Sequence, residues 1–378
     1  MNRNDDTNGW RDRRSFLAGT AALGAAGLAG CTGLFGGGDE EDDQYNYELE
    51  QIGSGREGRE LSGVPMSEMP DLEGELTIYS GRNEFLVGPL IEAINDFYDD
   101  FEATPRYQGS TDLVNKIRNE GSGSPADVFY SVNSGSLGAL ADAGRTRSLA
   151  SDVAEMVPPE FRTDQWIGTS GRARSVPYNT DAYSASDMPT SIDAYTDFDG
   201  QLGWAPGYGS CQAFVTAMRL LEGESATREW LEGIQSNGIQ RYPNELAVCE
   251  AIADGEIDAG FTNHYYIQRV LDGSSNASIA TAFTQGDAGS VFNVAGAAVV
   301  DSTDSPDLAQ NFVRHLLSAQ AQDYFARQTF EYPMSPEVDP IGNLPPIDEL
   351  NPPSGLDLSE LSNLQPTVDL MRDVGINL

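Results

Sequence analysis

The chain has 378 residues, and 59 acidic against 22 basic side chains give it a formal net charge of −37. Nucleic acids and anionic membrane surfaces bind proteins through Lys and Arg, so a chain this acidic is repelled by both. Its apolar residues, 39% of the total, are enough to form hydrophobic cores. The length predicts one large domain or two of ordinary size.

The basic residues are almost all arginines, because Lys116 is the one lysine in the sequence. We interpret the excess of carboxylates and the lack of lysine as adaptation to high salt. Crowded carboxylates stay hydrated when molar salt shortens the screening length to about 3 Å. An ordinary acidic protein is the alternative.

The first thirty residues are typical of an export signal. Arg13 and Arg14 precede an uncharged run from Leu17 to Leu28, which is shorter than the roughly 20 residues that span a membrane. Paired arginines before such a run indicate a twin-arginine signal over residues 1–30. The sequence Leu28 to Cys31 resembles the lipobox of exported lipoproteins, which implies a lipid anchor at Cys31 and a place on the outer face of the cytoplasmic membrane.

Residues 31–74 are rich in glycine and acidic residues and predict a flexible tether. Gly53, Gly55 and Gly58 match the G-x-G-x-x-G pattern of dinucleotide sites. No strand is expected before them and no helix after them, so the pattern carries no such prediction.

The body alternates short apolar runs with segments of helical periodicity, which predicts an α/β fold with parallel strands covered on both faces. A first set of elements ends near residue 141 and a second set begins at 174, so we expect two lobes with a ligand cleft between them. The first lobe comprises residues 75–175 plus 290–335, and the second comprises 176–289 plus 336–378. We expect strands at 76–79, 104–108, 126–130, 174–178, 202–205, 257–261 and 296–300, and helices at 85–97, 110–117, 137–141, 211–222, 244–254, 309–317 and 368–374.

Ligands of open α/β sheets bind beyond the carboxyl ends of strands, which directs attention to the loops 80–83, 131–135, 207–211 and 262–266. Histidine chemistry is scarce, because the chain has only His264 and His315. The usual zinc-protease, serine-hydrolase and nucleotide-binding motifs do not occur. A secreted glycosidase-like enzyme with paired carboxylates remains an alternative from another class.

Two of these loops carry tyrosines. Tyr265 and Tyr266 end one strand and Tyr208 follows another in the same lobe. Packing of aromatic rings at a domain interface is one interpretation. The other is a site for Fe(III), because three phenolates supply three negative charges to a hard trivalent cation.

Fe(III) takes six ligands, and three tyrosines leave half of them open. Arg82, Arg172, Arg174, Ser210 and the backbone N–H groups that follow Gly209 suit an oxyanion, so carbonate or a similar anion is expected to complete the shell. Surface solvation or structural ion pairing is the alternative for each arginine.

Five segments together resemble the ferric-iron-binding subunits of ABC importers, which are type II periplasmic binding proteins sometimes called bacterial transferrins. The resemblance implies that Tyr265 and Tyr266 are iron ligands, with Tyr208 as the third tyrosine of one subset. It also implies a monomer that is no enzyme and delivers Fe(III) to a permease and its ATPase. The matching segments are LTIYSGRNE (76–84), SPADVFYS (124–131), SGRAR with VPYNT (170–180), GEIDAGFTNHYY (255–266) and EYP (331–333).

The sequence departs from the family at two positions. Asn83 stands where some members have a histidine, and Val132 where some have a glutamate, so the three-tyrosine, anion-completed version of the site fits better. Glu84 is a weaker candidate ligand. The residues that we expect around the anion or the ligands are Arg82, Asn83, Arg172, Gly209, Ser210, Asn244 and Asn263.

A receptor for a small anion or an organic solute, built on the same Ser, Gly and Arg loops, is the alternative within binding proteins. Cys211 and Cys249 fit either one disulfide or two buried thiols. Asn276 begins a glycosylation sequon on an expected surface loop.

Overall fold

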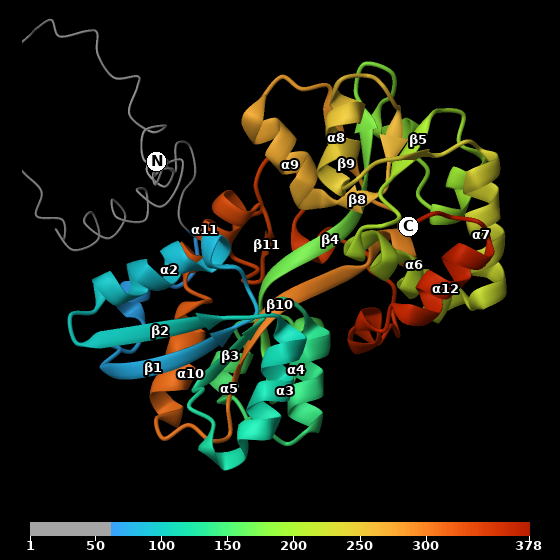
Figure 1. Ribbon diagram of the computed structural model, residues 1–378. Helices are drawn as coiled ribbons and strands as arrows, with labels where there is room; N and C mark the ends of the chain where they lie inside the picture. Colours follow the sequence, from blue (N-terminus) through green and yellow to red (C-terminus); the bar gives the residue numbers. More distant parts are fainter. Residues whose placement is uncertain (1–61) are drawn as a thin grey trace, which may run out of the picture. The chain divides into compact units, whose positions relative to one another are not determined.

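The computed structural model describes residues 62–378 (Figure 1). The expected signal over residues 1–30, the lipid anchor at Cys31 and most of the tether lie outside the described residues. Within this part of the chain, no helix is long and apolar enough to cross a membrane.

The strands form one network in which β4 is the shared member. The order is β2-β1-β3-β10-β4-β7-β5-β6, and β8, β9 and β11 also pair with β4. The strands are β1 (Gly74–Ser80), β2 (Phe101–Tyr107), β3 (Val128–Ser131), β4 (Ile167–Asn179), β5 (Leu202–Trp204), β6 (Gln240–Arg241), β7 (Ala259–Gly260), β8 (Thr262–Asn263), β9 (Ile279–Ala282), β10 (Phe292–Val299) and β11 (Tyr332–Pro333).

Helices follow most of the strands, as the alternating pattern predicts. They are α2 (Glu84–Phe97), α3 (Ser110–Glu120), α4 (Ser134–Asp142), α5 (Ser151–Ala154), α6 (Gly209–Glu222), α7 (Glu224–Ser236), α8 (Glu245–Ala253), α9 (His264–Gly273), α10 (Pro306–His315), α11 (Ala319–Tyr324) and α12 (Gln365–Asp373).

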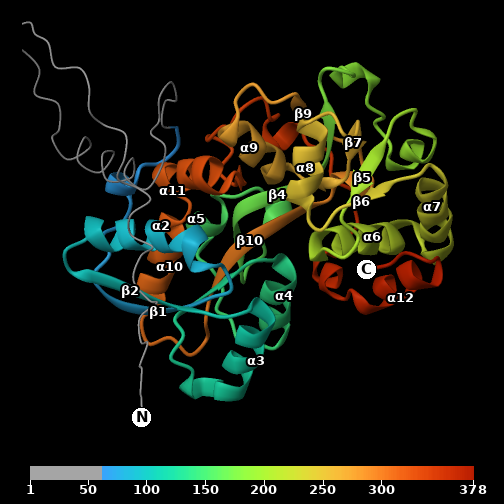
Figure 2. The ribbon, with the colours of Figure 1, turned by 45° about the horizontal axis from the view of Figure 1, so that its top comes forward.

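Two strands run between the two groups of helices. In Figures 1 and 2, β4 and β10 lie side by side and connect the helices α2 to α4 with the group that contains α6, α8 and α9. They are antiparallel, with Phe292 opposite Ala173. The first half of β4 pairs with β10 and β11, and its second half pairs with β7, β8 and β9. One strand therefore belongs to both halves of the fold.

The buried apolar side chains form separate cores on the two sides of these strands. One set packs around β1, β3 and β10 and contains Ile78, Val128 and Val294, all less than 1% exposed. The other packs around β5 and α6 and contains Trp204 and Phe214. Two cores joined by continuous strands give the two-lobed α/β architecture.

The structure differs from the sequence prediction in local details. The sheet is mixed rather than parallel, because β4 and β10 run antiparallel to each other and β10 antiparallel to β3. Gly109, not Ser110, precedes the first residue of α3, and the Ser110 hydroxyl accepts a hydrogen bond from the Val132 backbone N at 3.1 Å instead. Tyr265 and Tyr266 lie in the first turn of α9 rather than in a loop.

The boundary of the second lobe near residue 336 also differs. Leu344 is part of the first core, and Ile347 and Leu350 pack against it. The chain joins the second core later, at Leu361, Leu370 and other C-terminal residues. This proline-rich segment has no apolar periodicity that would predict where the chain passes from the first core to the second.

The cysteines are free and buried, so the two-thiol alternative is the one that the structure contains. Asn276 is exposed between α9 and β9, as expected for the sequon.

The close approach of β4 and β10 at Gly296 predicts that a side chain at this position destabilises the protein. A Cβ on Gly296 would lie 2.3 Å from the backbone oxygen of Ile167, which cannot move without breaking the strand pair. Gly296→Ala should therefore lower the free energy of unfolding by about 1–3 kcal/mol, the usual cost of overpacking. Gly123→Ala is the control, because a Cβ there meets nothing within 4 Å. Denaturation curves of both variants that coincide would contradict the prediction.

Candidate functional site

Two arginines of β4 point to the same side of the strand, because they are two residues apart and strand side chains alternate. Arg174 is 3% exposed and donates to Glu245 Oε1 at 2.5 Å and to the Phe261 backbone oxygen at 2.6 Å. Arg172 donates to the backbone oxygen of Val132, and its Nε lies 4.0 Å from Glu331 Oε1. Each arginine thus has a buried carboxylate next to it.

Glu245 joins three elements of the second lobe. It is the first residue of α8 and fully buried, and Asn244 caps the helix by accepting a hydrogen bond from the Ala247 backbone N. Besides Arg174, Glu245 accepts from Ser210 Oγ at 2.6 Å and from the Asn263 backbone N at 2.9 Å. Asn244 is therefore a helix cap, and its neighbour Glu245 connects the predicted site residues.

The three tyrosines predicted as ligands are brought together. Tyr208 directly precedes α6, and its hydroxyl lies 2.8 Å from that of Tyr266 in the first turn of α9. The Tyr265 and Tyr266 rings have centroids 4.4 Å apart, and Asn263 Nδ2 donates to the Tyr265 hydroxyl at 3.3 Å. The Tyr208 side chain is 36% exposed and Tyr266 is 7% exposed, so the cluster extends from the interior to solvent.

The surroundings keep these phenols neutral. Burial raises the pKa of Tyr265, and the Glu245 charge adds to the increase, while Arg172 and the hydrogen bond from Asn263 oppose it. Burial also raises the pKa of Tyr266, and the neighbouring Tyr265 and Tyr208 raise it further. A phenolate at either position therefore requires a cation close to the oxygens.

Arg269 supplies positive charge on the other side of the tyrosines. Its guanidinium carbon lies 5.3 Å from the centroid of the Tyr265 ring and 5.4 Å from that of Tyr266. Positions i, i+3 and i+4 share one side of a helix, which explains the contact within α9. A guanidinium over a ring face is attracted by the electron-rich face of the ring, so the contact helps to hold the two tyrosines in place.

A cavity of about 350 Å³ adjoins the tyrosines through Asn263, which lines it. Its polar part is made by Arg172, Arg174, Ser210 and Gly209, which is the first residue of α6. The helix N-terminus and the two arginines make this part suitable for an oxyanion. Its apolar part includes three leucines from the C-terminal segment.

Two predicted anion residues lie elsewhere. Arg82 is 1% exposed and donates to Glu331 Oε2 and to Ser170 Oγ, each at 2.7 Å, so it is part of a buried ion pair and does not line the cavity. Asn83 is exposed and directly precedes α2, next to the exposed Glu84. Structural ion pairing, which is the alternative interpretation given above for each arginine, therefore accounts for Arg82.

Glu331, from the EYP segment, connects Arg82 with the site. It also accepts from Ser170 Oγ at 2.8 Å and Thr329 Oγ1 at 3.0 Å. Burial alone would raise the pKa of Glu331, but Arg82, Arg172 and these hydrogen bonds outweigh it and lower that pKa. An ionised Glu331 thus balances one arginine charge beneath the site.

Among the described residues, neither the histidines nor an acidic cluster provides a metal site. His264 is fully buried, and its Nδ1 lies 3.1 Å from the Ala173 backbone N; burial lowers the pKa of His264 to about 4. No group of three or more His, Cys, Asp or Glu in residues 62–378 is arranged to hold a metal ion. The predicted oxygen donors that the described residues bring together beside the arginine cavity are the tyrosines.

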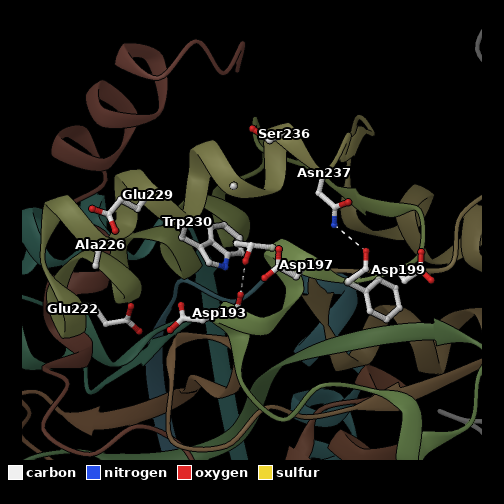
Figure 3. A pocket seen from close by; sticks show the side chains of 12 residues that line it. Asp193, Asp197, Asp199, Glu222, Ala226, Glu229, Trp230, Ser236 and Asn237 are labelled. Atoms are coloured by element: carbon white, nitrogen blue, oxygen red, sulfur yellow. Dashed lines mark hydrogen bonds between the residues drawn. The ribbon is translucent and has the colours of Figure 1, made fainter.

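A second hollow, of about 870 Å³, has a different character (Figure 3). It lies between α7 and the 3₁₀ helix η5 (Ile192–Asp197), and its lining includes Asp193, Asp197, Glu222 and Glu229 around Trp230, with no basic residue among the lining residues. Such a surface repels anions. It shares no lining residue with the tyrosine cluster or the arginine cavity.

Sequence reasoning missed Glu245, Glu331 and Arg269. Glu245 directly follows the predicted cap Asn244, and Glu331 is part of a segment that was noted without a role. Arg269 follows Tyr265 by four residues, a spacing that indicates contact once the tyrosines are placed on a helix.

A family model described as bacterial extracellular solute-binding protein matches residues 90–348. The chain belongs to this family of solute-binding proteins. Among its relatives is the major ferric iron-binding protein of Neisseria meningitidis serogroup A, 31% identical over 312 residues that cover 80% of this chain and 93% of the relative. The Fe(3+)-binding periplasmic protein of Serratia marcescens is 28% identical over 309 residues, 80% of this chain and 90% of the relative.

Solved structures give the same fold. Iron-bound HitA from Pseudomonas aeruginosa is 30% identical with a TM-score of 0.66, over 81% of this chain and all of the other. Apo FutA2 from Synechocystis is 27% identical with a TM-score of 0.64, over 81% and 100%. The two-lobed fold is confirmed. These relatives are binding proteins, so the chain is a binding protein and not the glycosidase-like enzyme of the alternative interpretation.

The position of Glu245 predicts a large effect of removing its charge. Glu245→Gln leaves the buried Arg174 without its ionic partner, and breaking a buried pair on one side costs about 3–5 kcal/mol. Chemical denaturation should show a loss of this size. Glu250→Gln, at an exposed position of the same helix, should change stability by no more than about 0.5 kcal/mol. Equal stability of the two variants would contradict the role given to Glu245.

Proposed function

We propose that the chain captures Fe(III) with Tyr208, Tyr265 and Tyr266 and delivers it to an ABC importer. The observation that carries the proposal is the convergence of the three phenol oxygens, two of them 2.8 Å apart, beside a cavity with two arginines. The ferric-binding names of the relatives support the choice of metal.

Charge balance explains why Fe(III) suits this cluster. Three phenolates neutralise a trivalent cation, whereas without it burial raises the pKa of Tyr265 and Tyr266 and keeps both protonated. A hard cation prefers anionic oxygen to histidine or thiolate. Iron binding therefore replaces phenol protons, and acid should favour release.

An anion completes the coordination in this proposal. Arg172, Arg174 and Ser210 line the cavity next to Asn263, and the start of α6 at Gly209 adds backbone N–H groups. Arg82 and Asn83, at the end of β1, would act from farther away, through Glu331 or on closure of the lobes. Carbonate or a similar oxyanion is the expected ligand at these donors.

The remaining assignments follow from the family and the N-terminal sequence. A solute-binding protein of an ABC importer has a permease and an ATPase as partners. Twin-arginine export and a lipid at Cys31 would hold the chain on the outer face of the cytoplasmic membrane as a monomer in a salt-rich medium.

Visible spectroscopy tests the iron site. Adding ferric citrate to the iron-free protein should produce a phenolate-to-iron charge-transfer band. The variant Tyr265→Phe with Tyr266→Phe should bind iron more than about 100-fold more weakly than the parent. This loss of affinity exceeds the usual effect of removing a residue that only supports a metal ligand, because the variant lacks two of the proposed ligands themselves.

Tyr242→Phe is the matched control. Tyr242 lies in the same lobe, and its hydroxyl donates to Glu256 at 2.9 Å rather than to the site. This variant should keep the band and the affinity. A parent protein without a band at saturating iron, or a double Phe variant that binds iron as tightly as the control, would overturn the proposal.

A further inference from the structure

The cavity beside the tyrosines has two unlike sides. Of the fourteen residues that line it, seven are apolar: Val132, Ala213, Phe214, Val291, Leu358, Leu361 and Leu364. The charged lining residues are Arg172 and Arg174, and no carboxylate lines it. Arg174 is 3% exposed, and its Nε has no hydrogen-bond partner. The cavity thus offers positive charge and an unused donor at one side and hydrocarbon at the other.

Three of the apolar lining residues come from one short segment near the C-terminus. Leu358, Leu361 and Leu364 recur every three residues, and the 3₁₀ helix η9 (Leu358–Ser362) contains the first two. A 3₁₀ helix has three residues per turn, so residues i and i+3 lie on the same side. This spacing directs the three leucines into the cavity together, and we call them the leucine wall.

The leucine wall is held in place by both halves of the fold. The segment η9 contacts α4 of the first lobe and α6 of the second. The following helix, α12, is tied to α6 by the Thr367 and Thr216 hydroxyls at 2.7 Å and by Arg219 Nε, which donates to Thr367 Oγ1 at 3.2 Å. An anchored wall of this kind can discriminate between ligands.

The size of the cavity points beyond an inorganic anion. At roughly 30 Å³ for each water molecule, 350 Å³ corresponds to about twelve waters. Hydrogencarbonate has four non-hydrogen atoms and would leave most of this space as water against leucine, which offers no hydrogen bonds. The volume instead falls at the lower end of pockets that bind small organic molecules, about 300–1,000 Å³.

We propose that the cavity binds an organic carboxylate with an apolar body. The carboxylate lies at Arg172, Arg174 and Ser210, and the hydrocarbon lies against the leucine wall. The inference deepens the proposed function, since an oxygen of this ligand next to Asn263 would face the Tyr265 hydroxyl and the iron. Binding of the carboxylate to the cavity does not itself require iron.

A pair of α-hydroxy acids tests the leucine wall. Glycolate and mandelate have the same hydroxycarboxylate group, and mandelate adds a phenyl ring. Isothermal titration of the iron-free protein should give at least about tenfold tighter binding of mandelate, the lower end of the discrimination that one added apolar group gives in a hydrophobic pocket. The same titrations in the presence of Fe(III) test whether the preference persists at the loaded site.

Leu364→Ser removes part of the wall with little risk to the fold. Leu364 is half-buried and directly precedes α12, so the substitution leaves the helix interior unchanged. Leu358→Ser removes a second half-buried leucine. Together these changes should abolish most of the preference for mandelate and leave glycolate binding within about twofold. Leu356→Ser is the matched control, because Leu356 is also half-buried in this segment but does not line the cavity.

The outcomes separate this inference from the proposed function. Equal binding of the two acids to the parent, or an unchanged preference in the wall variants, overturns the leucine wall even if iron binds with a charge-transfer band. Preference for mandelate without any iron binding supports the wall and rejects the iron site. If Leu356→Ser lost the preference for mandelate as the wall variants do, general destabilisation would explain the effect and the inference would be overturned.

Discussion

The site depends on two neighbouring arginines of one strand and on the buried carboxylates beside them. An isolated buried charge costs many kcal/mol, so the buried Arg174 needs its partner Glu245, which Ser210 also holds. Arg172 is partly exposed and lies 4.0 Å from Glu331, whose close ionic partner is Arg82. Because β4 belongs to both cores, this arrangement fixes positive charge at the junction of the two lobes.

The second constraint is the neutrality of the tyrosine cluster. Burial disfavours phenolate at Tyr265 and Tyr266, while Arg172 lowers the pKa of Tyr265. In the proposed function such a site discriminates by charge, because a trivalent hard cation compensates three phenolates and lower charges do not. The arginine cavity would then hold the anion.

Much of this arrangement follows from the sequence, and the rest depends on long-range contacts. The strand and helix pattern predicts the two lobes, and strand-end positions predict Tyr208, Tyr265 and Tyr266 as a group. Arg82 was misplaced, because an arginine in a strand-end loop has the same sequence signal whether it faces a ligand or a buried glutamate 249 residues away. Glu331 was noted only as part of a motif for the same reason.

The point at which the C-terminal segment passes from the first core to the second could not be predicted either. Its leucines have the three-residue spacing of a 3₁₀ helix, which is too short to give a clear periodic pattern. Only the packed structure places them opposite Arg172 and Arg174 in one cavity.

The central claim is that neutral, buried phenols become the ligands of a trivalent cation. Resonance Raman spectroscopy of the iron-loaded protein, excited within its visible band, tests this claim most directly. The account predicts enhanced tyrosinate ring vibrations that weaken in Tyr208→Phe and decrease further in Tyr265→Phe with Tyr266→Phe. A loaded protein without enhanced tyrosinate vibrations would contradict it.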